Sequence, residues 1–193
     1  MLQQKLYDWN IVLASQSPRR QQLLKELGID FKTQIKSVKE DYPSHLKREE
    51  ITHYLAKLKA SVFINLNKKE LIITSDTIVW FRNKPLEKPK DKEQAIKMLE
   101  ELSGKKHEVI TSVCLTSLGK QIIEFETTQV FFKKFSSDEI IFYVNQFSPF
   151  DKAGAYGIQD WLGYIGVEKI EGSYTNVMGL PTHLLYKMLN QFI

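Results

Sequence analysis

Short apolar runs alternate with helical spacings in the first half of the chain. The strongest run, residues 71–81, is rich in Ile and other β-branched residues and predicts a strand, as do the shorter runs at 9–14 and 31–35. Helical spacing occurs twice between these runs. Leu23, Leu24 and Leu27 predict a helix that begins at Ser17-Pro18 and ends at Gly28, and Ile51, Leu55, Leu58 and Val62 predict a second one.

The pattern changes after residue 90. Asp91-x-x-Gln94 resembles a capping box, and the apolar stripe behind it predicts a helix that ends at Gly104. The further predictions are a hairpin of 107–118 and 121–134 joined at Gly119-Lys120, a short helix capped by Ser136 and Glu139, a strand over 164–169, and a closing helix over 181–192. These elements together predict an α/β fold in which helices flank a mixed sheet, with two lobes around a substrate cleft.

Length and composition are those of one folded domain. The 193 residues are 42% hydrophobic and 26% charged, so we expect a single two-lobed domain over residues 1–193. Lys and Arg outnumber Asp and Glu by 19 to 13 in residues 1–100 but are outnumbered by 8 to 10 in residues 101–193. A modest, local basic excess favours a small anionic ligand over a long nucleic-acid track, so no stable nucleic-acid complex is expected.

Cysteine usage and hydropathy indicate the compartment. The single cysteine, Cys114, has no partner for an internal disulfide and lies in a strand-like context that predicts an inert buried thiol. No segment has the apolar length of a signal peptide or a membrane span. We therefore expect a cytoplasmic protein with no membrane partner.

Several common site motifs are absent. The four histidines form no H-x-x-x-H or H-E-x-x-H pattern, and Gly104-Lys105 lacks the upstream glycine of a phosphate-binding P-loop. Metal–thiolate chemistry and the usual nucleotide folds are therefore unsupported.

The first candidate site lies at a predicted strand-to-helix junction. Ser15, Ser17, Arg19 and Arg20 place hydroxyls, helix N–H groups and two guanidinium groups together, a combination that suits a polyphosphate. A capped helix with two solvated arginines explains the same residues equally well.

The second candidate is a carboxylate in the strongest apolar strand. Asp76, followed by Thr77, interrupts the run at its centre, and a buried carboxylate is costly unless it is paired or binds a metal. Among the lysines, Lys59 on an apolar helix face and Lys88 just after the strand are the ones placed for a ligand.

The third candidate is the glycine-rich stretch of residues 151–159. Its glycines allow a ligand close to the backbone, while Lys152, Tyr156 and Gln159 offer charge, stacking and amide hydrogen bonds to a base. A rigid surface turn is the alternative.

These segments in order resemble the Maf-like nucleoside triphosphate pyrophosphatases. The matching stretches are Leu13 to Arg20, Ser75 to Val79, Leu86 to Pro89, Leu102 to Lys105, Asp151 to Gln159, Gly172 to Tyr174 and Gly179 to Pro181. The stretch that ends at Gln159 is similar to the dTTP/UTP-selective branch, although Asp160-Trp161 stands where family members often have Gly.

The resemblance implies a fold similar to the inosine-triphosphatase group and an activity in nucleotide-pool housecleaning. A nucleoside triphosphate, dTTP, UTP or a modified pyrimidine nucleotide, would be hydrolysed to the monophosphate and pyrophosphate with a divalent cation, Mg²⁺ or Mn²⁺. Asp76, Glu40 and Lys59 are the implied catalytic residues, with Asp76 and Glu40 as metal ligands. The implied substrate-binding residues are Ser15, Arg19, Arg20, Thr77, Lys88 and Gln159. A homodimer is a further implication of the family.

Two other functions compete with this one. A regulatory protein that binds nucleotides or nucleic acid and acts in cell-division arrest without catalysis is compatible with the basic first half. A protein that only binds nucleotides does not need Asp76 among its phosphate-binding cations, since a carboxylate repels phosphate unless a metal intervenes. Asp76 therefore favours an enzyme over a binding protein. A phosphomonoesterase of the Asp-x-Asp type is disfavoured because Ile78 takes the second position.

Overall fold

The computed structural model describes residues 1–193 and divides the chain into two compact units. Unit 1 consists of residues 1–76, 111–126 and 179–193, and unit 2 of residues 77–110 and 127–178. Each unit is described separately below. No helix combines the length and the apolar character needed to cross a bilayer.

A seven-stranded mixed sheet carries the fold. Six strands follow the order β2-β1-β3-β5-β6-β7, and β4 pairs with β3. Strand β1 runs parallel to β2 and β3, whereas β4 is antiparallel to β3 and β7 antiparallel to β6. The strands are β1 (Asn10–Leu13), β2 (Lys32–Thr33), β3 (Glu70–Phe81), β4 (Lys84–Leu86), β5 (Lys106–Ser117), β6 (Lys120–Phe132) and β7 (Val167–Glu171).

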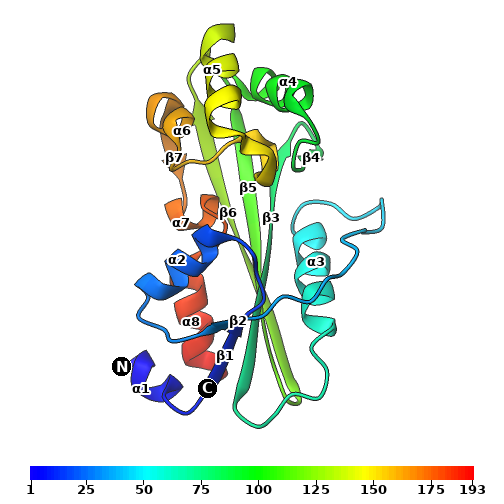
Figure 1. Ribbon diagram of the computed structural model, residues 1–193, viewed down its shortest axis with the longest axis vertical. Helices are drawn as coiled ribbons and strands as arrows, with labels where there is room; N and C mark the ends of the chain where they lie inside the picture. The colour runs from blue at the N-terminus through cyan, green and yellow to red at the C-terminus, as the bar shows by residue number, and fades with distance from the viewer. The chain divides into compact units, whose positions relative to one another are not determined.

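In unit 1, helices cover both faces of the parallel strands. Figure 1 shows α3 (Glu49–Ser61) on one side of β1 and β3, and α2 (Pro18–Glu26) and α8 (Thr182–Phe192) on the other. Because both faces are covered, successive residues of β1 and β3 are buried, which explains the continuous apolar runs. Val12 and Ile72 form one cluster with Phe63, which follows α3. A short helix α1 (Leu2–Leu6) precedes β1.

Unit 2 has the larger core. Helices α4 (Lys92–Leu102) and α5 (Ser137–Phe147) pack on each other and supply Leu99, Leu102 and Tyr143 to it. Two 3-10 turns, η1 (Pro149–Asp151) and η2 (Ala153–Ala155), then lead to α6 (Trp161–Gly166), and α7 (Tyr174–Val177) follows β7. The turn segment contributes Tyr156 and Ile158 to the same core.

Most of the predicted elements are confirmed, with shifts at their ends. Ser17 accepts a hydrogen bond from the backbone of Arg20 at the start of α2, and Ser136 and Glu139 form a complete capping box. Asp91 caps α4 through Gln94 N, but the Gln94 side chain bonds to Lys90 N, so the reciprocal half of that box is not formed. The predicted strand at 31–35 shrinks to the two residues of β2.

The strand predicted over residues 164–169 is wrong in its first half. Residues 161–166 form α6, and the strand begins only at Val167. Two glycines permit the close packing of this helix, because a Cβ at Gly163 would lie 2.0 Å from the carbonyl oxygen of Ile158, and one at Gly166 2.2 Å from the Phe135 ring. The helix forms in spite of the β propensity of its aromatic and branched residues, which tertiary context can override.

Candidate functional site

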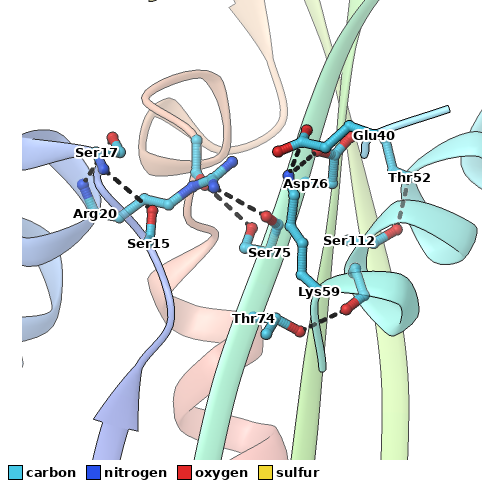
Figure 2. Close-up of polar contacts among 12 residues, drawn as sticks. Ser15, Ser17, Arg20, Glu40, Thr52, Lys59, Thr74, Ser75, Asp76 and Ser112 are labelled. Carbon is cyan, nitrogen blue, oxygen red and sulfur yellow. Dashed lines mark hydrogen bonds and ion pairs between the residues drawn. The ribbon is translucent and has the colours of Figure 1, made fainter. Parts of the chain in front are cut away.

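In unit 1, strand β3 presents polar side chains to both of its faces. Successive side chains of a strand alternate between faces, so Thr74 and Asp76 point one way and Ser75 the other. Thr74 donates to the carbonyl oxygen of Ala56 on α3 (2.7 Å), and Ser75 donates to the carbonyl oxygen of Gly179 (3.4 Å). Figure 2 shows the two sets of contacts on opposite sides of the strand.

Helix α3 is fixed against the sheet by hydroxyl contacts. Thr52 Oγ1 and Ser112 Oγ are 2.6 Å apart in the buried interface between α3 and β5, in addition to the Thr74 contact. This anchoring orients the last turn of α3, from which Lys59 reaches toward β3. The prediction that Lys59 lies on the apolar face of its helix is therefore confirmed, because its ammonium group reaches Asp76 on the buried strand β3.

Lys59 joins two carboxylates. Its Nζ lies 2.6 Å from Asp76 Oδ1 and 2.9 Å from Glu40 Oε2. The Asp76 side chain is 9% exposed and that of Glu40 48% exposed, so a buried and an open carboxylate converge on one ammonium group (Figure 2). Glu40 comes from the long connection between β2 and α3, where the sequence has little pattern of its own.

Burial dominates the electrostatics of Asp76. Loss of solvent raises the pKa of its carboxyl group, while the charge and hydrogen bond of Lys59 and the charge of Arg20 act in the opposite direction. A carboxylate with a raised pKa that remains next to cations has the properties of a general base.

Arg20 links α2 to the strand that carries Asp76. Its Nε donates to the carbonyl oxygen of Gly179 (2.8 Å) and its Nη1 to that of Ser75 (2.9 Å). Burial lowers the pKa of Arg20, with Asp76 opposing the effect, but a guanidinium group remains protonated at any physiological pH. Arg20 therefore carries its charge beside Asp76 and also holds the backbone on which Asp76 sits.

The start of α2 has the expected polar arrangement. Ser15 is buried, and its Oγ accepts from the backbone N of Ser17 (3.2 Å), whose own hydroxyl caps the helix at Arg20 N (3.4 Å). Arg19 is half-buried in the first turn of the helix and lies close enough for its charge to lower the pKa of Arg20. Ser15, Arg19, Arg20, Glu40, Lys59 and Asp76 all belong to unit 1.

The other predicted residues, Thr77, Lys88 and Gln159, belong to unit 2, where three of the predicted segments meet. Gly154 N donates to the carbonyl oxygen of Glu87, next to Lys88, at 3.2 Å. A Cβ at Gly154 would lie 2.8 Å from Val79 Cγ2, so only glycine, which also adopts the required φ of +69°, allows this approach. The segments around Thr77, Lys88 and Gln159 are thus brought together within unit 2.

One expectation for residues 151–159 is wrong. Tyr156 is only 5% exposed and cannot stack on a base, because its ring packs in the core and its hydroxyl lies 2.7 Å from His107 Nε2. Burial lowers the pKa of His107 to about 3, so the imidazole is neutral in this bond. Cys114, in contrast, is confirmed as a buried free thiol, and burial raises its pKa.

The donor set for a metal is small. No group of three or more His, Cys, Asp or Glu side chains could hold a metal ion. Asp76 and Glu40 converge as a pair, which fits a hard divalent cation whose remaining positions are filled by water and phosphate oxygens. A zinc or other thiolate-type site does not fit.

The fold and these residues define a class of protein. It is an α/β protein in which cations and the N–H groups of a helix start gather beside a buried carboxylate, an arrangement that can bind a polyphosphate together with a metal ion. Residues 10–192 match the family model of the Maf-like proteins. The chain belongs to that family.

Similar proteins agree with the assignment. The chain is 52% identical to the dTTP/UTP pyrophosphatase of Christiangramia forsetii, covering 100% of this chain and 99% of the relative. It is 50% identical to the dTTP/UTP pyrophosphatase of Flavobacterium johnsoniae, with both chains fully covered. Enzymes that act on triphosphates generally use a divalent cation to bridge phosphate oxygens, so these relatives indicate a divalent-metal dependence in general terms.

A solved structure supports the fold. The Ham1 protein of Staphylococcus aureus superposes with a TM-score of 0.54 at 16% identity, covering 95% of this chain and 100% of that one. The expected fold class, similar to that of the inosine-triphosphatase group, is confirmed.

Proposed function

We propose that this protein hydrolyses dTTP and UTP, and modified pyrimidine triphosphates, to the monophosphate and pyrophosphate, and thereby removes unwanted nucleotides from the pool. The observation that carries the proposal is the buried carboxylate of Asp76, which lies 2.6 Å from Lys59 and beside Arg20. Relatives at about half identity over the full chain carry the name of this activity.

In this proposal Asp76 is the general base. A water molecule attacks the α-phosphorus in line with the bond to the β-phosphate, its proton passes to Asp76, and pyrophosphate leaves. Lys59 fixes the orientation of the carboxylate and neutralises phosphate charge. Burial supports the role of Asp76, because the raised pKa makes the carboxylate a better proton acceptor than an exposed one.

The acid limb of the pH profile tests this role. A base must be deprotonated, so kcat/KM should fall as the pH drops through the pKa of Asp76. Lys59 lowers that pKa, so Lys59→Met should move the acid limb to higher pH, whatever it does to the maximal rate. Lys57→Met, an exposed lysine on the same helix, should leave the limb in place. An acid limb unchanged in Lys59→Met would rule out Asp76 as the titrating base.

Phosphate binding is assigned to the surrounding cations and hydroxyls. Arg19, Arg20 and Lys59 supply positive charge, and Ser15 with the first turn of α2 supplies hydrogen-bond donors. The proposal adds Thr77 and Lys88 from unit 2 as further phosphate contacts.

Asp76 and Glu40 are proposed to hold the divalent cation, Mg²⁺ or Mn²⁺. When bound, such a cation supplies positive charge to the phosphate oxygens as negative charge develops on the leaving group. The two carboxylates fit this role because they already meet at a single cationic group, Lys59 Nζ.

Base selection is assigned to Gln159. Its Oε1 is buried and makes no hydrogen bond in the structure, and an unpaired buried acceptor favours a ligand that donates to it. The N3–H group of uracil or thymine is such a donor.

The proposal extends to the setting of the protein. We propose a single two-lobed domain over residues 1–193 that acts in the cytoplasm, with the nucleotide as its main partner, no stable nucleic-acid complex, and a homodimer as the assembly. If the protein only bound nucleotides, the buried Asp76 would repel the phosphates and would have no part in binding. We therefore favour catalysis over binding alone.

A substrate panel tests the activity. The protein is incubated with the common ribo- and deoxyribonucleoside triphosphates and Mg²⁺ or Mn²⁺, and pyrophosphate and orthophosphate are measured separately. We expect pyrophosphate release that is fastest with dTTP and UTP. Release of orthophosphate, or a preference for purine triphosphates, would contradict the proposal.

A further inference from the structure

Gln159 occupies a short turn in unit 2. The backbone N of Asp160 donates to the carbonyl oxygen of Gly157 at 3.0 Å, so Ile158 and Gln159 are the two central residues of the turn. The backbone of this turn sets the direction of the Gln159 side chain. A group that fixes Gly157 and Asp160, the two ends of the turn, therefore also fixes the position of the Gln159 amide.

A single hydroxyl group holds both ends. Tyr143 on α5 accepts a hydrogen bond from Gly157 N at 3.1 Å and donates one to Asp160 Oδ2 at 3.0 Å. Burial first, and then the charge of Asp160, raises the pKa of Tyr143, so the hydroxyl keeps the proton that it donates. The ring is itself fixed, because it is fully buried and stacks on Phe147 with centroids 5.2 Å apart.

The Asp160 side chain accepts the hydrogen bond from Tyr143 and does not cap helix α6, which begins at the next residue. Aspartate at the first position before a helix normally accepts hydrogen bonds from the helix N–H groups, but here the side chain makes no such bond to α6. Its carboxylate is directed to Tyr143 and lies 3.6 Å from Lys152 Nζ. The packing is tight, since a Cβ at Gly157 would lie 2.5 Å from Asp160 Oδ2.

The turn also has an unpaired polar atom that points to a ligand. Gln159 Oε1 is buried without a hydrogen-bond partner, while the Tyr143 and Asp160 side chains that flank it are paired with one another. An unpaired buried acceptor costs free energy in the unliganded protein, and a donor from a bound base removes that cost.

We propose that Tyr143 and Asp160 are positioning residues for base selection. Together they hold the Gly157–Asp160 turn so that the Gln159 amide can pair with the edge of a uracil or thymine base. This inference rests on the proposed function, and it assigns Asp160 a specific role in this chain.

Removal of the hydroxyl tests the inference. Tyr143→Phe keeps the ring and deletes both hydrogen bonds. We expect the ratio of kcat/KM for UTP to that for GTP to fall by about 5- to 30-fold, the range for one or two lost hydrogen bonds. The loss should lie mainly in KM for UTP, since Asp76 is untouched. In a Gln159→Ala background the same substitution should leave the ratio unchanged, because the amide that it positions is gone.

Substitutions at Asp160 provide the matched controls. Asp160→Asn retains an acceptor oxygen for Tyr143 and should keep most of the UTP preference. Asp160→Ala removes one of the two hydrogen bonds, so it should lower the ratio in the same direction as Tyr143→Phe but by a smaller factor. If circular dichroism shows that Tyr143→Phe is unfolded, the comparison of Asp160→Asn with Asp160→Ala tests the positioning role instead. Equal ratios in wild type and Tyr143→Phe, or an equal drop with and without Gln159, would overturn the inference while leaving the proposed activity intact.

Measurement of UMP binding tests the positioning role independently of the proposed pyrophosphatase activity. If the wild-type protein releases no pyrophosphate, the proposed function fails, and titration calorimetry with UMP still measures base recognition. UMP binding about tenfold weaker in Tyr143→Phe than in wild type would support the positioning role. Equal affinity, or no UMP binding by the wild-type protein, would overturn it.

Discussion

Replacing Asp76 with asparagine is expected to lower kcat by about 10²-fold or more, the usual effect of removing a general base. Asparagine keeps the shape of the side chain but cannot take a proton. Lys59 and Arg20 still attract the phosphates, and Glu40 remains as a ligand for the cation, so affinity for the substrate should fall less than turnover. Single-turnover kinetics with UTP measures the chemical step, and calorimetry with a non-hydrolysable UTP analogue measures binding.

The control for this substitution is Asp30→Asn. Asp30 is an exposed aspartate of the same unit that lies outside the proposed site, so its replacement should leave kcat near the wild-type value. Nearly normal turnover in a correctly folded Asp76→Asn protein would return Asp76 to a purely structural role as the partner of Lys59.

The second large effect is expected at Gln159. Loss of a paired polar contact to the base costs about 1–3 kcal/mol, roughly 5- to 150-fold in kcat/KM. Gln159→Ala should therefore reduce the preference for UTP over other triphosphates by a factor in this range, with pyrophosphate still the product. Steady-state kinetics with UTP, CTP, ATP and GTP gives the ranking.

Gln146→Ala provides the comparison for that experiment. Gln146 lies exposed on α5 in the same unit, and its removal should change neither the ranking nor the ratios. If the wild-type protein acts best on GTP, or if Gln159→Ala leaves every ratio as it was, the assignment of base selection to residues 151–159 is wrong.

Local signals in the sequence predicted much of the fold. The Ser17 and Ser136 caps, the hairpin around Gly119 and the buried strand through Asp76 depend on residues that are close in sequence, and each is present in the structure. The strand predicted over residues 31–35 is longer than the observed β2, and residues 164–166 belong to helix α6 instead of a strand. Gly166 of that helix packs against Phe135, 31 positions away, a contact that no local pattern indicates.

The sequence indicates several residues of the candidate site, but it does not indicate which of them contact one another. Asp76 stands out because a carboxylate interrupts an apolar strand, and Lys59 because it lies on an apolar helix face. The link from Arg20 to Gly179 spans 159 positions, and no local pattern announces it. Glu40 comes from a patternless connection, so only the resemblance to the family indicated it before the structure placed it on Lys59.

Tyr143 shows the same limit more clearly. It falls within the short helix that the sequence predicts after Ser136, and the structure buries it in the core of unit 2. Its hydroxyl matters because it meets Gly157 and Asp160, 14 and 17 positions away. A helix pattern reports which face is buried but not which polar atom at that face has a partner.

The products formed from UTP in ¹⁸O-labelled water test the central claim most directly. Mass spectrometry of the wild-type reaction should show UMP and pyrophosphate in equal amounts, with the heavy oxygen in UMP, because water attacks the α-phosphorus and pyrophosphate leaves. Asp76→Asn protein should yield almost none of either product. Formation of UDP and orthophosphate, or unchanged UTP with wild-type protein, would contradict the account.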